Sequence, residues 1–258
     1  MSRILKFGRK PARSGTAKSL VVFLHGYGAD GADLLGLADV LAPQLPDTAF
    51  AAPDAAERIQ GAAFGNQWFA IPRFDGSTEA QAEAGLKMAT VDVNAFLDQR
   101  LAYEGLRPQA LALVGFSQGA MMALQVAPRR AVAMAAVVAI SGRLIHPERL
   151  ATEARVKPPV LVMHGDQDQV VDFAEMSLAA DALTAAGFDT YGHVMAGAGH
   201  GIAEDGLSTA LAFLKQFLPA CSALTTDTAP TGHFPNQPCN PPPPSPLPPS
   251  ATVSQTAF

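Results

Sequence analysis

The chain has 258 residues, of which 48% are hydrophobic and 16% are charged, which is enough for one globular domain with a large core. The formal net charge is -5, and no run of lysine or arginine is long enough to follow a phosphate backbone, so we do not expect nucleic acid as a partner. No segment reaches the roughly 20 apolar residues of a membrane span, and the basic N-terminus lacks the apolar stretch of a signal peptide. Only two cysteines occur, Cys221 and Cys239. These features predict a protein of the cytoplasm that is not integral to a membrane and does not depend on disulfides.

Composition divides the chain into two parts. After about Leu218 the sequence becomes rich in Pro, Ser, Thr and Ala, and from 219 to 258 it carries one charge, Asp227. Such a segment cannot bury enough apolar surface to offset its ordering entropy. We predict one domain over residues 1–219 and a proline-rich disordered tail over 220–258, which acts either as an inert extension or as a ligand for a proline-binding domain.

Apolar runs alternate with amphipathic stretches throughout the predicted domain. The runs that predict strands span 19–24, 48–51, 111–115, 137–140, 160–164 and 190–194. The stretches that predict helices span 31–41, 77–103, 118–126, 173–186 and 204–217. Continuously apolar strands separated by helices indicate a mostly parallel sheet with helices on both faces, so the fold class is α/β.

The segment Gly115-Phe116-Ser117-Gln118-Gly119 carries the strongest chemical signal. In a GxSxG sequence the serine lies on a sharp turn from strand to helix, which lifts its hydroxyl above the carboxyl end of the sheet. A serine hydroxyl is a weak nucleophile without a base, and serine is also a common helix N-cap. The motif therefore indicates a nucleophile only if the chain also supplies a base and an acid.

Candidates for both follow in the order serine, acid, histidine. His200 lies between glycines in "GAGHGI", where flanking glycines let an imidazole project from a crowded turn, and we take it as the general base. Asp166 and Asp168, in "HGDQDQVV", both remain candidates for the carboxylate that orients this base. His25 and His164 each follow a strand directly and are interpreted as turn residues. No His, Cys, Asp or Glu cluster has metal-ligand spacing and no dinucleotide fingerprint is complete, so we expect no metal and no cofactor.

Two further sets of residues complete the predicted site. The backbone N–H of Gln118, directly after the nucleophile, is one expected oxyanion donor, and Leu24, at the end of an early strand, is the other. Trp68, Phe69 and Ile71 lie between a strand and the long helix. They either wall an acyl pocket or pack in the core, and the sequence favours neither alternative.

Several of these motifs together resemble the carboxylesterase/phospholipase group of α/β-hydrolases, which includes acyl-protein thioesterases. The motifs, in chain order, are "FLHGYGADGADL", "AAPDA", "QWF", "GFSQGAMMAL", "ISGRL", "HGDQDQVV" and "GHGI". The resemblance spans roughly 18–218 and implies the α/β-hydrolase fold. The stretch that contains Trp68 and Phe69 is short, so we expect no large cap domain of the kind found in interfacial lipases. The resemblance assigns the acid to Asp168 and supports Leu24 and Gln118 as the oxyanion pair. The proline-rich extension matches nothing in this family.

The sequence thus predicts a serine hydrolase that cleaves carboxylic esters, and by extension thioesters, of small or medium acyl groups. Ser117, His200 and Asp168 would form the triad, and the reaction would pass through an acyl-enzyme intermediate. The alternatives are an acyl-protein thioesterase or a lysophospholipase, then a serine peptidase or a binding domain with an idle triad. The expected partner is a small-molecule ester or thioester, and the resemblance leaves a homodimer open.

Overall fold

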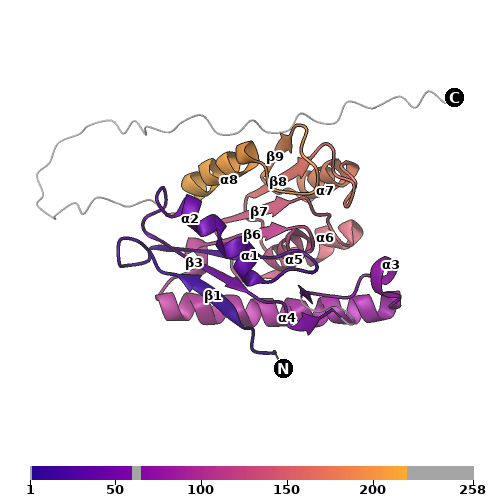
Figure 1. Cartoon of the computed structure of the whole chain (residues 1–258), viewed down its shortest axis with the longest axis horizontal. Helices are drawn as coiled ribbons and strands as arrows, with labels where there is room; N and C mark the ends of the chain where they lie inside the picture. Colours follow the sequence, from indigo (N-terminus) through magenta and orange to yellow (C-terminus); the bar gives the residue numbers. More distant parts are fainter. Residues whose placement is uncertain (1, 60–64, 220–258) are drawn as a thin grey trace, which may run out of the picture.

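A central sheet of seven strands organises the protein (Figure 1). The computed structural model describes residues 2–59 and 65–219, so the predicted tail at 220–258 lies outside the described residues. The strand order is β1-β3-β2-β6-β7-β8-β9, with β1 antiparallel to β3 and every other neighbouring pair parallel. The strands are β1 (Phe7–Lys10), β2 (Ser19–Leu24), β3 (Thr48–Pro53), β6 (Leu111–Phe116), β7 (Ala136–Ile140), β8 (Val160–Gly165) and β9 (Thr190–Met195). A separate ribbon pairs β4 (Glu57–Arg58) with β5 (Asn66–Gln67).

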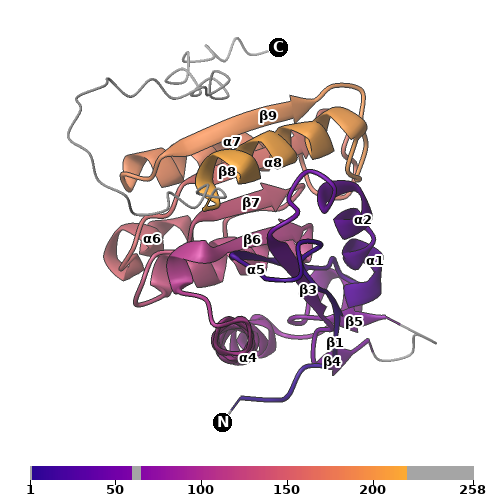
Figure 2. The same cartoon turned by 90° about the vertical axis from the view of Figure 1, so that its left-hand side faces the viewer.

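Helices cover both faces of this sheet. They are α1 (Gly31–Leu35), α2 (Leu37–Leu41), α3 (Pro72–Asp75), α4 (Glu79–Glu104), α5 (Gln118–Val126), α6 (Pro147–Glu153), α7 (Ala174–Ala185) and α8 (Glu204–Phe217). Alternate residues of β2 separate two apolar clusters: Leu20 and Val22 pack with α4, α5, α6 and α7, whereas Val21 and Phe23 pack with α1, α2 and α8. Figure 2 shows the same layers with α4 seen end-on. The mostly parallel α/β sheet predicted from alternating strands and helices is confirmed, and it has the architecture that the resemblance to α/β-hydrolases implies.

The long helix α4 illustrates why these residues form these elements. Thr78 caps its N-terminus in a reciprocal pair with Gln81, and Gly105 ends it in the left-handed conformation at φ 66°. Between β3 and α4 the described chain contains only the β4–β5 ribbon and the single turn of α3. No large cap domain is therefore present in this part of the chain.

Local differences from the predicted elements have identifiable causes. All six predicted strands and the five predicted helical regions are present, with ends shifted by a few residues. The region 31–41 forms two short helices that meet at Gly36, because glycine weakens a helix interior. The edge strand β1 was not predicted, because its sequence FGRK contains two cations and lacks an apolar run. Such a charged strand is typical of a sheet edge.

Strand order brings several loops to one edge of the sheet. β2, β6, β7, β8 and β9 run parallel to one another, so the loops that follow them meet at their carboxyl ends. Ser117, Asp168 and His200 lie in three of these loops. Within residues 2–59 and 65–219, no helix has both the length and the apolar character to cross a bilayer.

We propose residues 1–219 as the folding unit, because Phe213, Leu214 and Leu218 complete the core near the end of the described chain. A variant ending at Pro219 should keep the melting temperature of the full chain within about 2 °C, since it retains all of this packing. A control ending at Ala212 removes two fully buried side chains and should melt far lower. Thermal unfolding of the three proteins measures both effects, and a large drop on ending at Pro219 would contradict the proposed boundary.

Candidate active site

Ser117 forms the turn between a strand and a helix. β6 ends at Phe116, α5 begins at Gln118, and Ser117 between them has φ 54° and ψ -118°, a strained conformation for a residue with a Cβ. A Cβ on Gly115 would lie 2.2 Å from the carbonyl oxygen of Gly119. A Cβ on Gly119 would lie 1.9 Å from the carbonyl oxygen of Leu24. Both flanking glycines are therefore required because backbone atoms occupy the space of a side chain.

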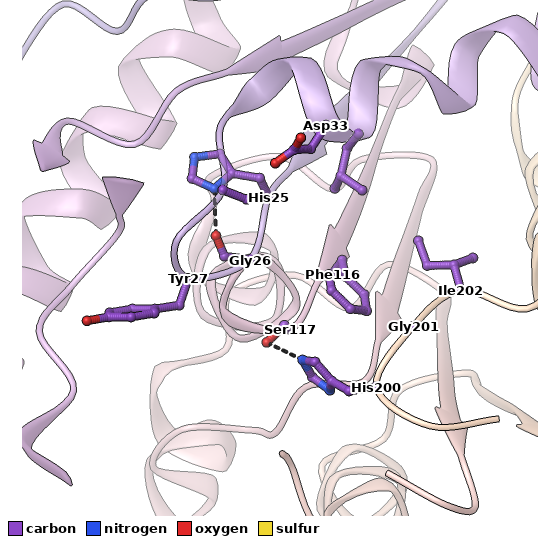
Figure 3. A pocket seen from close by; sticks show the side chains of 11 residues that line it. His25, Gly26, Tyr27, Asp33, Phe116, Ser117, His200, Gly201 and Ile202 are labelled. Carbon is purple, nitrogen blue, oxygen red and sulfur yellow. Dashed lines mark hydrogen bonds between the residues drawn. The ribbon is translucent and has the colours of Figure 1, made fainter. Parts of the chain in front are cut away.

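His200 lies between the serine and an aspartate. Its Nε2 is 3.0 Å from Ser117 Oγ, and Figure 3 shows this contact as a dashed line. Its Nδ1 is 2.7 Å from Asp168 Oδ2. The Phe116 ring packs at 5.0 Å from the imidazole and limits how far it can turn. The three side chains come from loops after β6, β8 and β9, so the sheet brings together residues up to 83 positions apart.

The carboxylate of Asp168 is buried and well supplied with hydrogen-bond donors. Oδ1 accepts from the backbone N–H groups of Val170 and Val171 at 2.8 and 3.0 Å. Oδ2 lies near the rings of His200 and His164, at 2.7 and 3.2 Å. Burial raises the pKa of Asp168, but the hydrogen bonds from His200 and the two backbone groups outweigh it and hold the pKa below its usual range. The carboxylate is therefore ionised at neutral pH.

The sequence left Asp166 and Asp168 as alternatives, and the structure gives them different places. Asp166 Oδ1 accepts from the backbone N–H of Gly197 at 2.7 Å, which ties the loop after β8 to the loop after β9. Asp166 makes no contact with His200 among the described hydrogen bonds and ion pairs. Its part is to hold together the two loops that carry Asp168 and His200.

His25 shapes the loop that follows β2. Its Nε2 accepts from the backbone N–H of Ala55 at 2.9 Å, so the proton is on Nδ1, which donates to the carbonyl oxygen of Gly26 at 2.7 Å. Burial lowers the pKa of His25, and the hydrogen bond to Gly26 and the nearby carboxylates oppose this only in part, so the ring is neutral. The Nε1–H of Trp68 donates to the His25 carbonyl oxygen at 2.9 Å. These bonds fix the path of the chain from Leu24 to Tyr27.

The two predicted oxyanion donors are placed differently by the structure. Gln118 begins α5 directly beside Ser117, where its N–H is at a helix N-terminus. Leu24 is fully buried inside β2, in register with Gly115, and does not line the cavity at Ser117. Tyr27, three residues further on, does line it. The signal for Tyr27 was available in the sequence, because it lies between Gly26 and Gly28 in the loop after the strand.

The side chain of Gln118 has a role that sequence analysis missed. Its Oε1 accepts from the backbone N–H of Trp68 at 2.9 Å, and its Nε2 donates to the carbonyl oxygen of Phe69 at 2.7 Å. The residue is fully buried. One amide thus joins the turn at Ser117 to a segment about 50 residues earlier in the chain.

The predicted acyl-wall residues lie outside the two cavities of the site region. Trp68 is 1% exposed and Phe69 is 7% exposed, and both belong to the core cluster on the α4 and α5 face. Ile71 precedes α3 and does not line either cavity in the described chain. Trp68 and Phe69 therefore pack in the core, which is one of the two alternatives that the sequence left open. Ala70 and Phe74 from the same segment do line a cavity.

Two cavities meet at Tyr27. The first, of about 340 Å³, contains Ser117 and His200 (Figure 3). The second, of about 1050 Å³, lies between the β4–β5 ribbon, α3 and the start of α4. Tyr27 is the one residue shared by the described linings of both. Residues 2–59 and 65–219 contain no group of three or more His, Cys, Asp or Glu side chains placed to hold a metal ion.

Comparison with known proteins places this chain in a family. Residues 11–218 match the Phospholipase/Carboxylesterase family, to which the chain belongs. Esterase YpfH of Escherichia coli K12 is 28% identical over 205 residues, which cover 79% of this chain and 84% of that protein. Acyl-protein thioesterase 1 of Gibberella zeae is 24% identical and covers 77% of this chain and 90% of its own. The crystal structure of esterase PE8 is 44% identical, with a TM-score of 0.79 and coverage of 84% and 100%. The protein is a hydrolase of an esterase and thioesterase family.

The contact between Gly119 and Leu24 can be tested by adding one methyl group. Gly119→Ala should lower the free energy of unfolding by about 3 kcal/mol, because the new Cβ would meet a backbone oxygen that has no room to move. Gly36→Ala is the matched control, since that Cβ meets nothing closer than 3.7 Å. Urea denaturation of both variants gives the comparison, and equal stabilities would contradict the close approach.

The ionisation of Asp168 should appear in the pH dependence of stability. Its pKa is lower in the folded protein than the ordinary value of about 3.9 in an unfolded chain. Its contribution is therefore fully present above the unfolded pKa and is lost as pH falls through the folded pKa. Asp168→Asn should destabilise the protein at pH 7, and the difference from wild type should shrink below about pH 4. Chemical denaturation at several pH values checks this, and a difference that stays constant down to pH 3 would oppose it.

Proposed function

We propose that the protein hydrolyses carboxylic esters with Ser117 as nucleophile, His200 as general base and Asp168 as the residue that orients the base. The observation that carries this proposal is the continuous chain of contacts from Asp168 Oδ2 to His200 Nδ1, and from His200 Nε2 to Ser117 Oγ. A helix cap or a binding loop has no need of a base aligned on a serine hydroxyl. Membership of the Phospholipase/Carboxylesterase family supports the same reaction.

The first half of the reaction forms an acyl-enzyme. Ser117 Oγ adds to the carbonyl carbon of the ester, and its proton passes to His200 Nε2. Asp168 holds the ring and stabilises the imidazolium that forms. The carbon–oxygen bond to the alcohol then breaks, and His200 gives the proton to the departing oxygen. The acyl group remains as an ester of Ser117.

Water completes the second half by the same route. His200 removes a proton from water while the water oxygen adds to the acyl carbon. The bond to Ser117 then breaks, and the serine oxygen takes the proton back from His200. The products are a carboxylic acid and the alcohol, and the enzyme returns to its starting state without an added cofactor.

For the oxyanion we propose the backbone N–H groups of Gln118 and Tyr27, with Tyr27 in place of Leu24. Gln118 directly follows Ser117 at the start of α5, and Tyr27 lies in the wall of the cavity that contains Ser117. Neither N–H has an acceptor among the described hydrogen bonds. Preorganised backbone donors of this kind contribute about 3 kcal/mol each to the stabilisation of the transition state.

We propose small or medium acyl groups as substrates, because no cap domain in the described chain encloses a long chain over the site. Thioesters are the second candidate class. The observation in their favour is the similarity to acyl-protein thioesterase 1, and the triad chemistry is the same with sulfur as the departing atom.

Initial rates on p-nitrophenyl esters from acetate to palmitate test this function. Wild type should hydrolyse the shorter esters, and Ser117→Ala should lower kcat by about 10⁴-fold or more, because the nucleophile is lost. Asp166→Asn serves as a matched control for Asp168→Asn. The first keeps an oxygen that can accept from Gly197 and should keep most of kcat, whereas the second should lose at least about 10²-fold. A Ser117→Ala variant with most of its activity would overturn the assignment.

A further inference from the structure

The cavity at Ser117 changes chemical character along its length. Ser117 and His200 lie at one end, and Asp33 of α1 lies toward the opposite end (Figure 3). Between them the wall includes the apolar side chains of Leu34 and Ile202 and the ring of Phe116. Along its length the cavity therefore presents the reacting groups at one end, an apolar wall between, and a carboxylate at the other end.

The position of His200 indicates which part of an ester occupies this cavity. The base must return its proton to the departing oxygen, so that oxygen has to lie within hydrogen-bond reach of Nε2. The cavity wall continues from His200 through Gly201 to Ile202, so a group attached to the departing oxygen extends along it. Among the described residues, the larger cavity shares only Tyr27 with the lining of the first and does not include His200, which leaves it for the acyl side.

The described lining of the cavity carries a negative charge and no positively charged Lys or Arg. Asp33 is the only Asp, Glu, Lys or Arg in the described lining. Its Oδ2 accepts from the backbone N–H of Asp30 at 3.2 Å, which fixes the carboxylate at the rim. The negative charges of Asp30, Asp33 and Asp54 all raise the pKa of the neighbouring ring of His25. Aromatic rings and carboxylates both attract small organic cations, and Phe116 and Asp33 line the same cavity.

We propose that this cavity is a leaving-group subsite in which Asp33 favours esters of alcohols that carry an ammonium group. The inference rests on the ester hydrolysis proposed above and adds to it a preference for one class of alcohol. Leu34, Phe116 and Ile202 pack against the carbon atoms between the ester oxygen and the nitrogen, and Asp33 faces the positive charge. A neutral alcohol of the same shape gains the apolar contact but not the charge interaction.

A pair of substrates that differ only in charge isolates this effect. Acetylcholine and 3,3-dimethylbutyl acetate have the same shape, with a quaternary nitrogen in one and a quaternary carbon in the other. The measured quantity is the ratio of kcat/KM for the cationic ester to kcat/KM for the neutral ester, followed by release of acetic acid. Asp33→Asn keeps an oxygen that can accept from Asp30, so the start of α1 is preserved. Asp181→Asn, on the exposed surface of α7, is the control that removes the same charge elsewhere.

We expect the ratio of the two kcat/KM values to fall about fivefold in Asp33→Asn, because a charge pair exposed to water contributes an effect of this size. The ratio should stay at the wild-type value in Asp181→Asn. The rate on the neutral ester should be the same in all three proteins. Raising ionic strength should lower the wild-type ratio toward that of Asp33→Asn, because exposed charges are screened by salt. An equal ratio in wild type and Asp33→Asn overturns the inference and leaves the esterase function intact.

Two further outcomes separate this inference from the function on which it rests. If wild type hydrolyses p-nitrophenyl esters but neither member of the pair, the cavity does not accept this kind of leaving group and the inference is wrong. If wild type hydrolyses no ester at all, including the p-nitrophenyl series, the proposed function fails and the inference fails with it.

Discussion

The close approach of backbone segments at the carboxyl end of β6 is the constraint on which the rest of the site depends. Gly119 lies against the carbonyl oxygen of Leu24, and Gly115 lies against that of Gly119. A Cβ on Gly142, after β7, would lie 2.9 Å from the carbonyl oxygen of Ser117. With no side chains between them, β2, β6, β7 and the start of α5 meet through their backbones. This contact holds Ser117 at φ 54° and directs its hydroxyl toward His200.

Buried polar groups then transmit this geometry to the surrounding loops. The amide of Gln118 binds the backbone of Trp68 and Phe69, and the indole of Trp68 binds the carbonyl oxygen of His25. His25 in turn holds Gly26, next to Tyr27. The partners of Gln118 and Trp68, and the Ala55 N–H that donates to His25, come from distant parts of the chain, so the loop after β2 cannot shift without breaking a buried hydrogen bond. The walls of the cavity are thus fixed by the same residues that fix the nucleophile.

Carboxylates in this region have separate tasks that follow from their surroundings. Asp168 is buried under two backbone donors and two histidine rings, Asp166 ties two loops together, and Asp33 lies exposed at the cavity rim. The first two are only two residues apart in the chain. Their side chains diverge because the turn after β8 directs one toward His200 and the other toward Gly197. Position relative to the sheet edge, rather than residue type, decides what each carboxylate can do.

The sequence by itself determined the fold class and indicated Ser117 as nucleophile and His200 as base, whereas its preference for Asp168 over Asp166 came only from the family resemblance. The fold class can be predicted from one sequence because the spacing of apolar residues reflects which side of each element is buried. The candidate residues can be predicted because the serine motif and its partners follow a fixed order along the chain. Only the tertiary structure decided that Tyr27 rather than Leu24 lines the cavity, that Trp68 and Phe69 pack in the core, and that Asp33 lies at the rim. The physical reason is that these outcomes depend on which atoms meet across loops distant in sequence. No local pattern records where a strand ends relative to its neighbours or which face of a short helix overlooks a cavity.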